Sequence, residues 1–134
     1  MSASNEVRQK LTAKALEARK NAYVPYSHYQ VGAALLTRSG KIYTGCNIEN
    51  AAYPVTICGE RTAMFKAVSE GDRDFDTIVI ATRDGGSPCG ACRQVMAEFA
   101  LDMDVICVDE TGKPVIEMTV RELLPGAFMP EHLI

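Results

Sequence analysis

Three cysteines and one glutamate stand at spacings that suit a metal centre. Cys58 is followed two residues later by Glu60, and Cys89 and Cys92 are separated by only two residues. Residues three apart on a helix lie one above the other, so two thiolates there can bind one zinc ion at about 2.3 Å each. A structural zinc site is closed by four protein ligands, whereas a catalytic site keeps one position open. Three thiolates therefore predict a catalytic zinc ion, one per subunit.

Glu60 has the position of a proton carrier rather than that of a fourth ligand. Positions two apart on a helix do not share a face, so its carboxylate should stand beside the metal. Zinc lowers the pKa of bound water to about 7, and a neighbouring carboxylate can pass the released proton to a leaving group. The alternative is a first-turn carboxylate favoured by the helix dipole. Arg61 and Gln94, each near a cysteine along the chain, are predicted to donate hydrogen bonds to sulfur.

A structural zinc ion or plain buried thiols are the alternatives for the three cysteines. A structural site would need a fourth Cys or His, and both histidines, His28 and His132, lie in segments far from the motif. Cys46 and Cys107 stand in apolar, strand-like runs and are interpreted as core residues. Five cysteines in a chain without an export signal indicate reduced thiols rather than a disulfide framework.

The elements that must position these side chains follow from the pattern of apolar residues. Helices are predicted over residues 5–21, 58–70, 89–99 and 119–123, and strands over 31–37, 41–46, 77–81, 105–108 and 115–118. This order predicts a single domain over 1–134 with a three-layer α/β/α fold and a mixed sheet of about five strands. The helix from Cys58 advances about 20 Å and the strand after it returns about 20 Å, so both helix N-termini should meet at the metal.

The overall charge excludes some classes of partner. The chain has 134 residues and a formal net charge of −3, with no basic patch, so a nucleic-acid partner is not favoured. The N-terminal residues lack the sections of a signal peptide, and no apolar run approaches the roughly 20 residues of a membrane span. We therefore expect a cytoplasmic protein with no membrane partner.

Six segments carry a resemblance to a known family. They are Tyr23–Ser27, Val31–Leu35, Gly45–Ala51, Ile57–Ala63, Ser87–Gln94 and Leu123–Phe128. Together they resemble the small homotetrameric cytidine deaminases, zinc-dependent members of the cytidine and deoxycytidylate deaminase superfamily. The resemblance implies a cytidine deaminase-like fold and hydrolysis of cytidine and 2'-deoxycytidine to uridine and 2'-deoxyuridine plus ammonia, in pyrimidine salvage.

The resemblance repeats the zinc and proton-carrier roles above, adds a contact of the proton carrier with the pyrimidine ring, and implies further roles. Asn47 and Glu49 would hold the ribose hydroxyls of a nucleoside, Tyr29 would stack near the base, and Gly59 would offer a backbone contact. Phe128 would reach the pocket of a neighbouring subunit, so a homotetramer would share its pockets. From the residues alone, Asn47 and Glu49 are equally compatible with turn chemistry, and Tyr29 and Phe128 with packing.

The chain departs from the family pattern at three places. Gly59 stands where alanine is usual, which leaves the backbone contact but loosens the loop. Tyr29 stands where phenylalanine is usual, which adds a hydroxyl group that could alter the substrate range. The loop over residues 83–87 is about two residues shorter than is typical, which could reshape the rim of the pocket.

Other functions remain as alternatives at this stage. The same chemistry could act on a modified cytosine nucleoside, an aminated antibiotic nucleoside or a free base, although Asn47 and Glu49 favour a ribose-bearing substrate. A nucleic-acid editor would need a basic groove with stacking aromatic residues, and this chain is acidic and lacks tryptophan. A non-enzymatic, zinc-stabilised interaction module is the third alternative.

Overall fold

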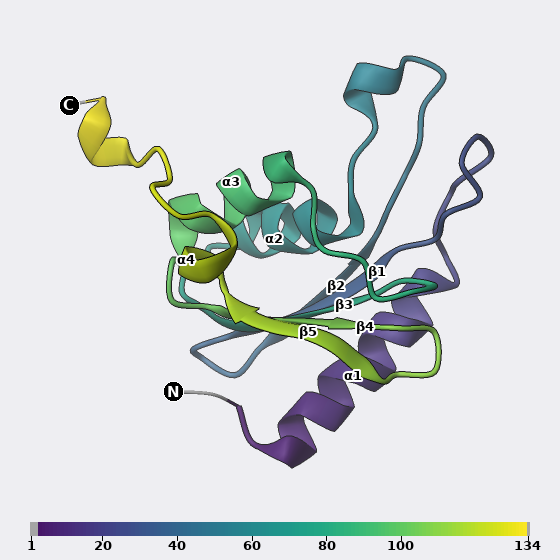
Figure 1. Ribbon diagram of the computed structural model, residues 1–134, viewed down its shortest axis with the longest axis horizontal. Coiled ribbons are helices and arrows are strands. Elements are labelled where there is room, and N and C mark those ends of the chain that lie inside the picture. Colours follow the sequence, from purple (N-terminus) through teal and green to yellow (C-terminus); the bar gives the residue numbers. More distant parts are fainter. Residues whose placement is uncertain (1–2, 134) are drawn as a thin grey trace.

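A five-stranded sheet forms the middle layer of the protein, with helices on both of its faces (Figure 1). The structure is a computed structural model and describes residues 3–133. In spatial order the strands are β2 (Ile42–Cys46), β1 (Gly32–Thr37), β3 (Phe75–Ala81), β4 (Asp104–Val108) and β5 (Pro114–Thr119). Only β3 and β4 pair in parallel, and the other three neighbouring pairs are antiparallel. The predicted α/β fold with a mixed sheet of five strands is confirmed.

One helix covers one face of the sheet, and three helices cover the other (Figure 1). The first is α1 (Asn5–Arg19), and the other face carries α2 (Gly59–Ser69), α3 (Gly90–Phe99) and α4 (Val120–Leu123). Two single turns of 3-10 helix, Tyr53–Val55 and Pro130–His132, lie in the connecting segments. Within residues 3–133, none of the helices combines the length and apolar character that a membrane crossing requires.

The central strand β3 connects the two hydrophobic cores. Ile78 and Ile80 point into the core beneath α2 and α3, whereas Val79 and Ala81 point into the core beneath α1. A strand that is covered on both faces needs apolar residues at every position, which explains its unbroken apolar run. β3 therefore provides a rigid support from which the chain leads to the N-terminus of α3.

The helices at the cysteine motif begin one residue later than predicted. Cys58 and Cys89 are the N-cap residues of α2 and α3, with extended backbone angles, and not their first helical residues. An N-cap residue sits at the mouth of its helix, where the backbone N–H groups are unpaired. Both thiols are thus placed at the positive ends of helix dipoles.

The two remaining cysteines differ in their surroundings. Cys107 is fully buried in the core, as predicted. The prediction is wrong for Cys46, which is only half-buried. Cys46 ends the edge strand β2, in which Tyr43 and Gly45 are the buried residues, so strand alternation places Cys46 on the less covered face.

A close approach of backbones fixes α2 against β2. A Cβ atom on Gly45 would lie 2.6 Å from the Ala63 nitrogen and 2.7 Å from the Gly59 oxygen. Only glycine permits this distance, and the contact holds the first turn of α2 next to the end of β2. The sequence after β2 then forms the wall of a cavity in front of that turn.

Candidate active site

The three predicted thiol ligands come together in one cluster. The Cys58 Sγ atom lies 3.8 Å from that of Cys89, which lies 3.5 Å from that of Cys92. All three sulfur atoms lie within 4.8 Å of one another. Two sulfurs bound to one zinc ion at 2.3 Å with a tetrahedral angle lie about 3.8 Å apart. The cluster therefore fits a zinc ion held by three sulfurs, and the described chain brings no fourth Cys, His, Asp or Glu into it.

Arg93 holds the α3 end of the cluster in place. Its guanidinium donates to the Pro88 carbonyl at 2.8 Å, to the Leu123 carbonyl at 2.7 Å, and to the Ser87 hydroxyl. These bonds tie the loop before α3 to the end of α4, which fixes the backbone on which Cys89 sits. We did not predict this role from the sequence, because the carbonyl partners lie on segments that have no motif of their own.

The surroundings of Cys58 favour its ionised form. Hydrogen bonding with Cys92, together with the Arg61 guanidinium and Cys89, lowers the pKa of Cys58 to about 5. The Arg61 Nη2 atom donates to the Cys58 sulfur at 3.5 Å, so the predicted bond from Arg61 to sulfur is present. Hydrogen bonding to Cys58 and burial raise the pKa of Cys92 above its ordinary value. One thiolate is therefore available without metal, whereas Cys92 must lose its proton when a metal binds.

Glu60 is a buried carboxylate beside the cluster. Its side chain is 4% exposed, and its Oε1 atom has no hydrogen-bond partner within the described chain. Burial raises the pKa of Glu60 to about 7, because the desolvated carboxylate is less favourable than the neutral acid. A carboxyl group with such a pKa can both take up and release a proton near neutral pH. An unpaired oxygen in a buried site also indicates that a substrate or solvent group completes its hydrogen bonding.

A cavity of about 310 Å³ opens in front of Glu60 and the cluster. Its lining includes the polar side chains that the resemblance assigns to substrate binding, namely Tyr29, Asn47 and Glu49, together with Glu60. Thr82 and Gly86, from the segment between β3 and α3, also line it. The volume lies at the lower end of the range for small-molecule sites. A larger hollow of about 440 Å³ lies between α1 and the β4–β5 turn, but it contains none of the clustered thiols.

Asn47 and Glu49 both make hydrogen bonds that shape the wall of this cavity. The Asn47 side chain accepts from the Val31 N–H at 2.9 Å and donates to the Tyr29 carbonyl at 2.7 Å. Glu49 accepts from two backbone N–H groups, at 3.0 and 3.1 Å, and from the Ser27 hydroxyl at 2.5 Å. Bonding to Ser27 holds the pKa of Glu49 below its usual range. Both side chains are thus held in fixed orientations at the cavity.

Gly59 is buried at the first turn of α2, against the segment that leads into β1. A Cβ atom there would lie 3.1 Å from the Val31 oxygen and 3.2 Å from the Val31 side chain. Such contacts are tighter than most real Cβ contacts, so an alanine at this position would require Val31 to shift. The glycine therefore allows the backbone around the site to pack closely.

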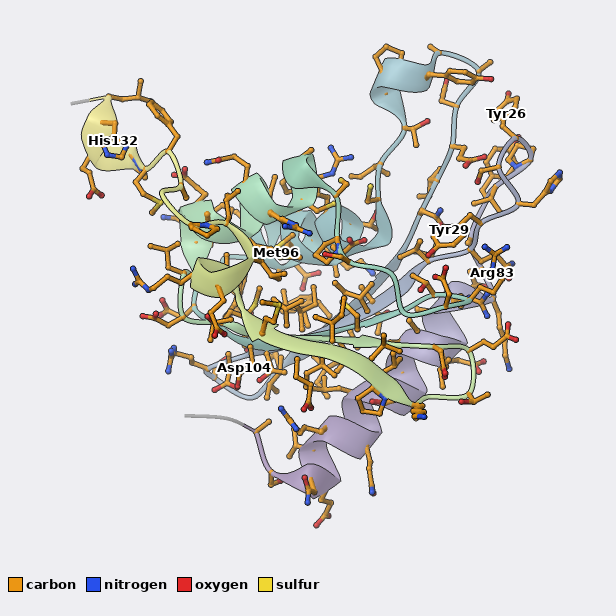
Figure 2. All side chains as sticks on the ribbon, viewed as in Figure 1. Tyr26, Tyr29, Arg83, Met96, Asp104 and His132 are labelled. Atoms are coloured by element: carbon orange, nitrogen blue, oxygen red, sulfur yellow. The ribbon has the colours of Figure 1, made fainter. Side chains whose placement is uncertain are left out.

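The C-terminal residues lie at the opposite end of the molecule from Tyr29. Figure 2 shows His132 on the terminal turn, far from Tyr29 and Arg83, and the Phe128 ring packs against His132 at 5.3 Å between centroids. Phe128 is 54% exposed and does not line the cavity of its own chain. The Gln94 amide donates to the Phe128 carbonyl at 2.8 Å and not to sulfur, which differs from the prediction. Gln94 lies two positions beyond Cys92 on α3, and positions two apart do not share a helix face.

Comparisons with known proteins agree with this geometry. The family model described as the cytidine and deoxycytidylate deaminase zinc-binding region matches residues 5–108. A cytidine deaminase of Sporosarcina psychrophila is 54% identical over 127 residues, which cover 93% of each chain. A cytidine deaminase of Halalkalibacterium halodurans is 51% identical over 128 residues, covering 94% of this chain and 97% of the relative.

A solved structure has the same fold over nearly the whole chain. The crystal structure of cytidine deaminase from Burkholderia pseudomallei superposes with a TM-score of 0.86 at 40% identity, covering 94% of this chain and 100% of that one. Since the family model spans most of the sequence and the relatives align over nearly all of it, the chain belongs to the zinc-binding cytidine and deoxycytidylate deaminase family.

Proposed function

We propose that this protein catalyses the zinc-dependent hydrolytic deamination of cytidine and 2'-deoxycytidine to uridine and 2'-deoxyuridine, with release of ammonia, in pyrimidine salvage. The observation that carries this proposal is the buried carboxylate of Glu60, whose Oε1 atom has no hydrogen-bond partner in the described part of the chain, beside three clustered sulfurs and on one substrate-sized cavity. The similarity to cytidine deaminases over nearly the whole chain supports the choice of substrate.

The three cysteines and Glu60 divide the chemistry between them. Cys58, Cys89 and Cys92 would hold one zinc ion per chain, which supplies Lewis-acid activation of water at neutral pH. Glu60 takes one proton from the attacking water and delivers it to N3 of the pyrimidine. It then carries the remaining proton of the new C4 hydroxyl group to the amino group, which leaves as ammonia. One water is consumed and one ammonia released, so Glu60 returns to its starting state. The Arg61 bond to Cys58 holds that sulfur in position.

Asn47 and Glu49 select for the sugar. Both side chains line the cavity with Tyr29 and are oriented by bonds to the protein, so their remaining donors and acceptors are available to ribose hydroxyl groups. Tyr29 would stack near the base, and the backbone at Gly59 would contact it. This arrangement requires a nucleoside, because a free base would leave the remaining donors and acceptors of Asn47 and Glu49 without partners.

Turnover of a substrate panel, followed by ultraviolet absorbance, tests this function. We expect cytidine and 2'-deoxycytidine to react, with little turnover of cytosine, an aminated antibiotic nucleoside or a cytosine-containing single-stranded oligonucleotide. Zinc measured in the same preparation should approach one ion per chain. Equal turnover of cytosine would contradict the roles of Asn47 and Glu49, and an active but metal-free protein would contradict the proposal as a whole.

We also propose a homotetramer in which subunits share their pockets. Phe128 is 54% exposed and does not line the cavity of its own chain, so its ring is available to a neighbouring one. Tyr53 and Val55, 70% and 65% exposed, add apolar surface on the segment that borders the cavity. Sedimentation equilibrium should give about four times the chain mass of 14.6 kDa. An active monomer would contradict this assembly.

The proposed location is the cytoplasm, with no membrane or nucleic-acid partner. Five cysteines are free in the part of the chain that the structure describes, and thiols that must bind zinc require a reducing compartment. The Glu49 carboxylate lines the cavity, and the Asp84 carboxylate bonds to Tyr29 in that lining; both would repel the phosphate backbone of a nucleic acid. Fractionation of cells should recover the activity with the cytoplasmic proteins, and its recovery outside that fraction would contradict this location.

A further inference from the structure

Tyr29 is held on two sides by the loop that follows β3. Its hydroxyl donates to the Asp84 Oδ1 atom at 2.9 Å, and the Arg83 guanidinium lies 5.6 Å from the centroid of its ring (Figure 2). A carboxylate on the hydroxyl and a cation over the face together restrict both the tilt and the rotation of the ring. The same ring lines the cavity that contains Cys58 and Glu60.

The loop that supplies these partners is itself rigid. The Thr82 N–H donates to the Val108 carbonyl at 3.1 Å, and the Asp84 backbone pairs with that of Asp109, so the loop extends the sheet beyond β3 and β4. The buried Thr82 hydroxyl accepts from the N–H groups of Gly85 at 2.8 Å and Gly86 at 3.1 Å. These bonds hold the backbone of Asp84 in place, so a side chain that hydrogen-bonds to the Asp84 carboxylate is held in place as well.

The fit between the loop and the Tyr29 hydroxyl is close. A Cβ atom on Gly86 would lie 3.2 Å from the Tyr29 oxygen and 3.4 Å from the Asp84 Oδ1 atom. Bonding to Tyr29 holds the pKa of Asp84 below its usual range, so the carboxylate is charged and the hydrogen bond is charge-assisted. A phenylalanine at position 29 would fill the same volume but leave the carboxylate without this donor.

We propose that Asp84 is a positioning residue of the deaminase, which acts by holding the Tyr29 ring against the nucleoside. This inference rests on the proposed function. The Tyr29–Asp84 bond contributes to substrate binding and not to the chemical step, because neither residue touches the clustered sulfurs or Glu60 through a hydrogen bond. An interaction of equal strength in the bound substrate and the transition state changes KM while kcat is unchanged.

Steady-state kinetics on the zinc-loaded enzyme test the pair. For both Tyr29→Phe and Asp84→Ala we expect KM for cytidine to rise about threefold to tenfold, with kcat within about twofold, the effect of one partly exposed charge-assisted bond. The inhibition constant of uridine should rise in step with KM. The double variant should resemble Tyr29→Phe alone, and Asp84→Asn, which keeps an acceptor oxygen, should recover part of the loss.

A matched control is Asp109→Asn, on the adjacent loop. The Asp109 side chain accepts from the Thr111 N–H at 2.9 Å and does not hydrogen-bond to Tyr29. The KM of the Asp109→Asn enzyme for cytidine should therefore equal that of the wild type. The inference is overturned if KM of both single variants stays within twofold of the wild type, if their effects multiply in the double variant, or if kcat falls instead. Tyr29→Phe alters no loop residue, so it decides the matter even if Asp84→Ala unfolds. A wild-type protein that fails to deaminate cytidine would contradict the proposed function instead.

Discussion

Replacing Glu60 with glutamine should lower kcat for cytidine by about 10²- to 10⁴-fold, the usual contribution of a positioned acid or base. Glutamine keeps the volume of the buried side chain but can neither take up nor release a proton at neutral pH. The zinc content should remain near one ion per chain, because Glu60 is not one of the clustered metal-ligating groups. Ultraviolet turnover and metal analysis on the same sample measure both quantities.

Glu70→Gln is the matched control for this variant. Glu70 caps the other end of α2 and is exposed, so the same change of charge on the same helix should leave kcat unaltered. If Glu60→Gln keeps more than half of the wild-type activity, the proton-carrier role is wrong. If it loses its zinc together with its activity, Glu60 supports the metal site and the assignment must be revised.

Replacing Cys89 with alanine should abolish activity by removing the metal. Even groups that only orient a metal ligand change metal affinity about 10- to 100-fold, so loss of a direct ligand should weaken zinc binding by at least about 100-fold. A metal bound at 100 times its dissociation constant stabilises the folded state by about 2.7 kcal/mol. The variant should therefore also melt at a lower temperature than the zinc-loaded wild type, and a strong chelator should shift the wild type in the same direction.

Cys46→Ala provides the comparison for the loss of a thiol as such. Cys46 is half-buried and lies outside the sulfur cluster, so this variant should keep one zinc ion per chain and its turnover. Melting curves with and without chelator, recorded beside zinc analysis, separate the two variants. Full zinc occupancy and activity in Cys89→Ala would show that the metal is held elsewhere and would remove the basis of the proposed mechanism.

The helices and strands were largely predictable, because burial imposes a regular spacing of apolar residues that can be recognised within each segment by itself. β3 shows this clearly, since a strand covered on both faces must be apolar throughout, and Val79 and Ile80 face different cores. The ends of elements were less predictable. Cys58 and Cys89 proved to be caps and not helical residues, because the end of a helix depends on what its first N–H groups meet.

The groups that do the chemistry were also predictable, because thiolate and carboxylate types at short spacing have few other uses. Their neighbours were not. Gln94 bonds to the Phe128 carbonyl, 34 residues away, and Arg93 bonds to the Leu123 carbonyl, 30 residues away. No local pattern relates such partners, so only the packing of the C-terminal segment against α3 determines them.

By itself, then, the sequence determined the order of helices and strands and the residues able to bind zinc and carry a proton. The tertiary structure alone decided that the Cys58 and Cys89 sulfurs lie 3.8 Å apart, that the buried Oε1 atom of Glu60 has no hydrogen-bond partner among the described residues, and that Tyr29 bonds to Asp84. The physical reason is the range of the interactions involved. Periodicity and capping act within a few residues, whereas these contacts join segments 31 and 55 residues apart, which meet only because the packed sheet and helices bring them together.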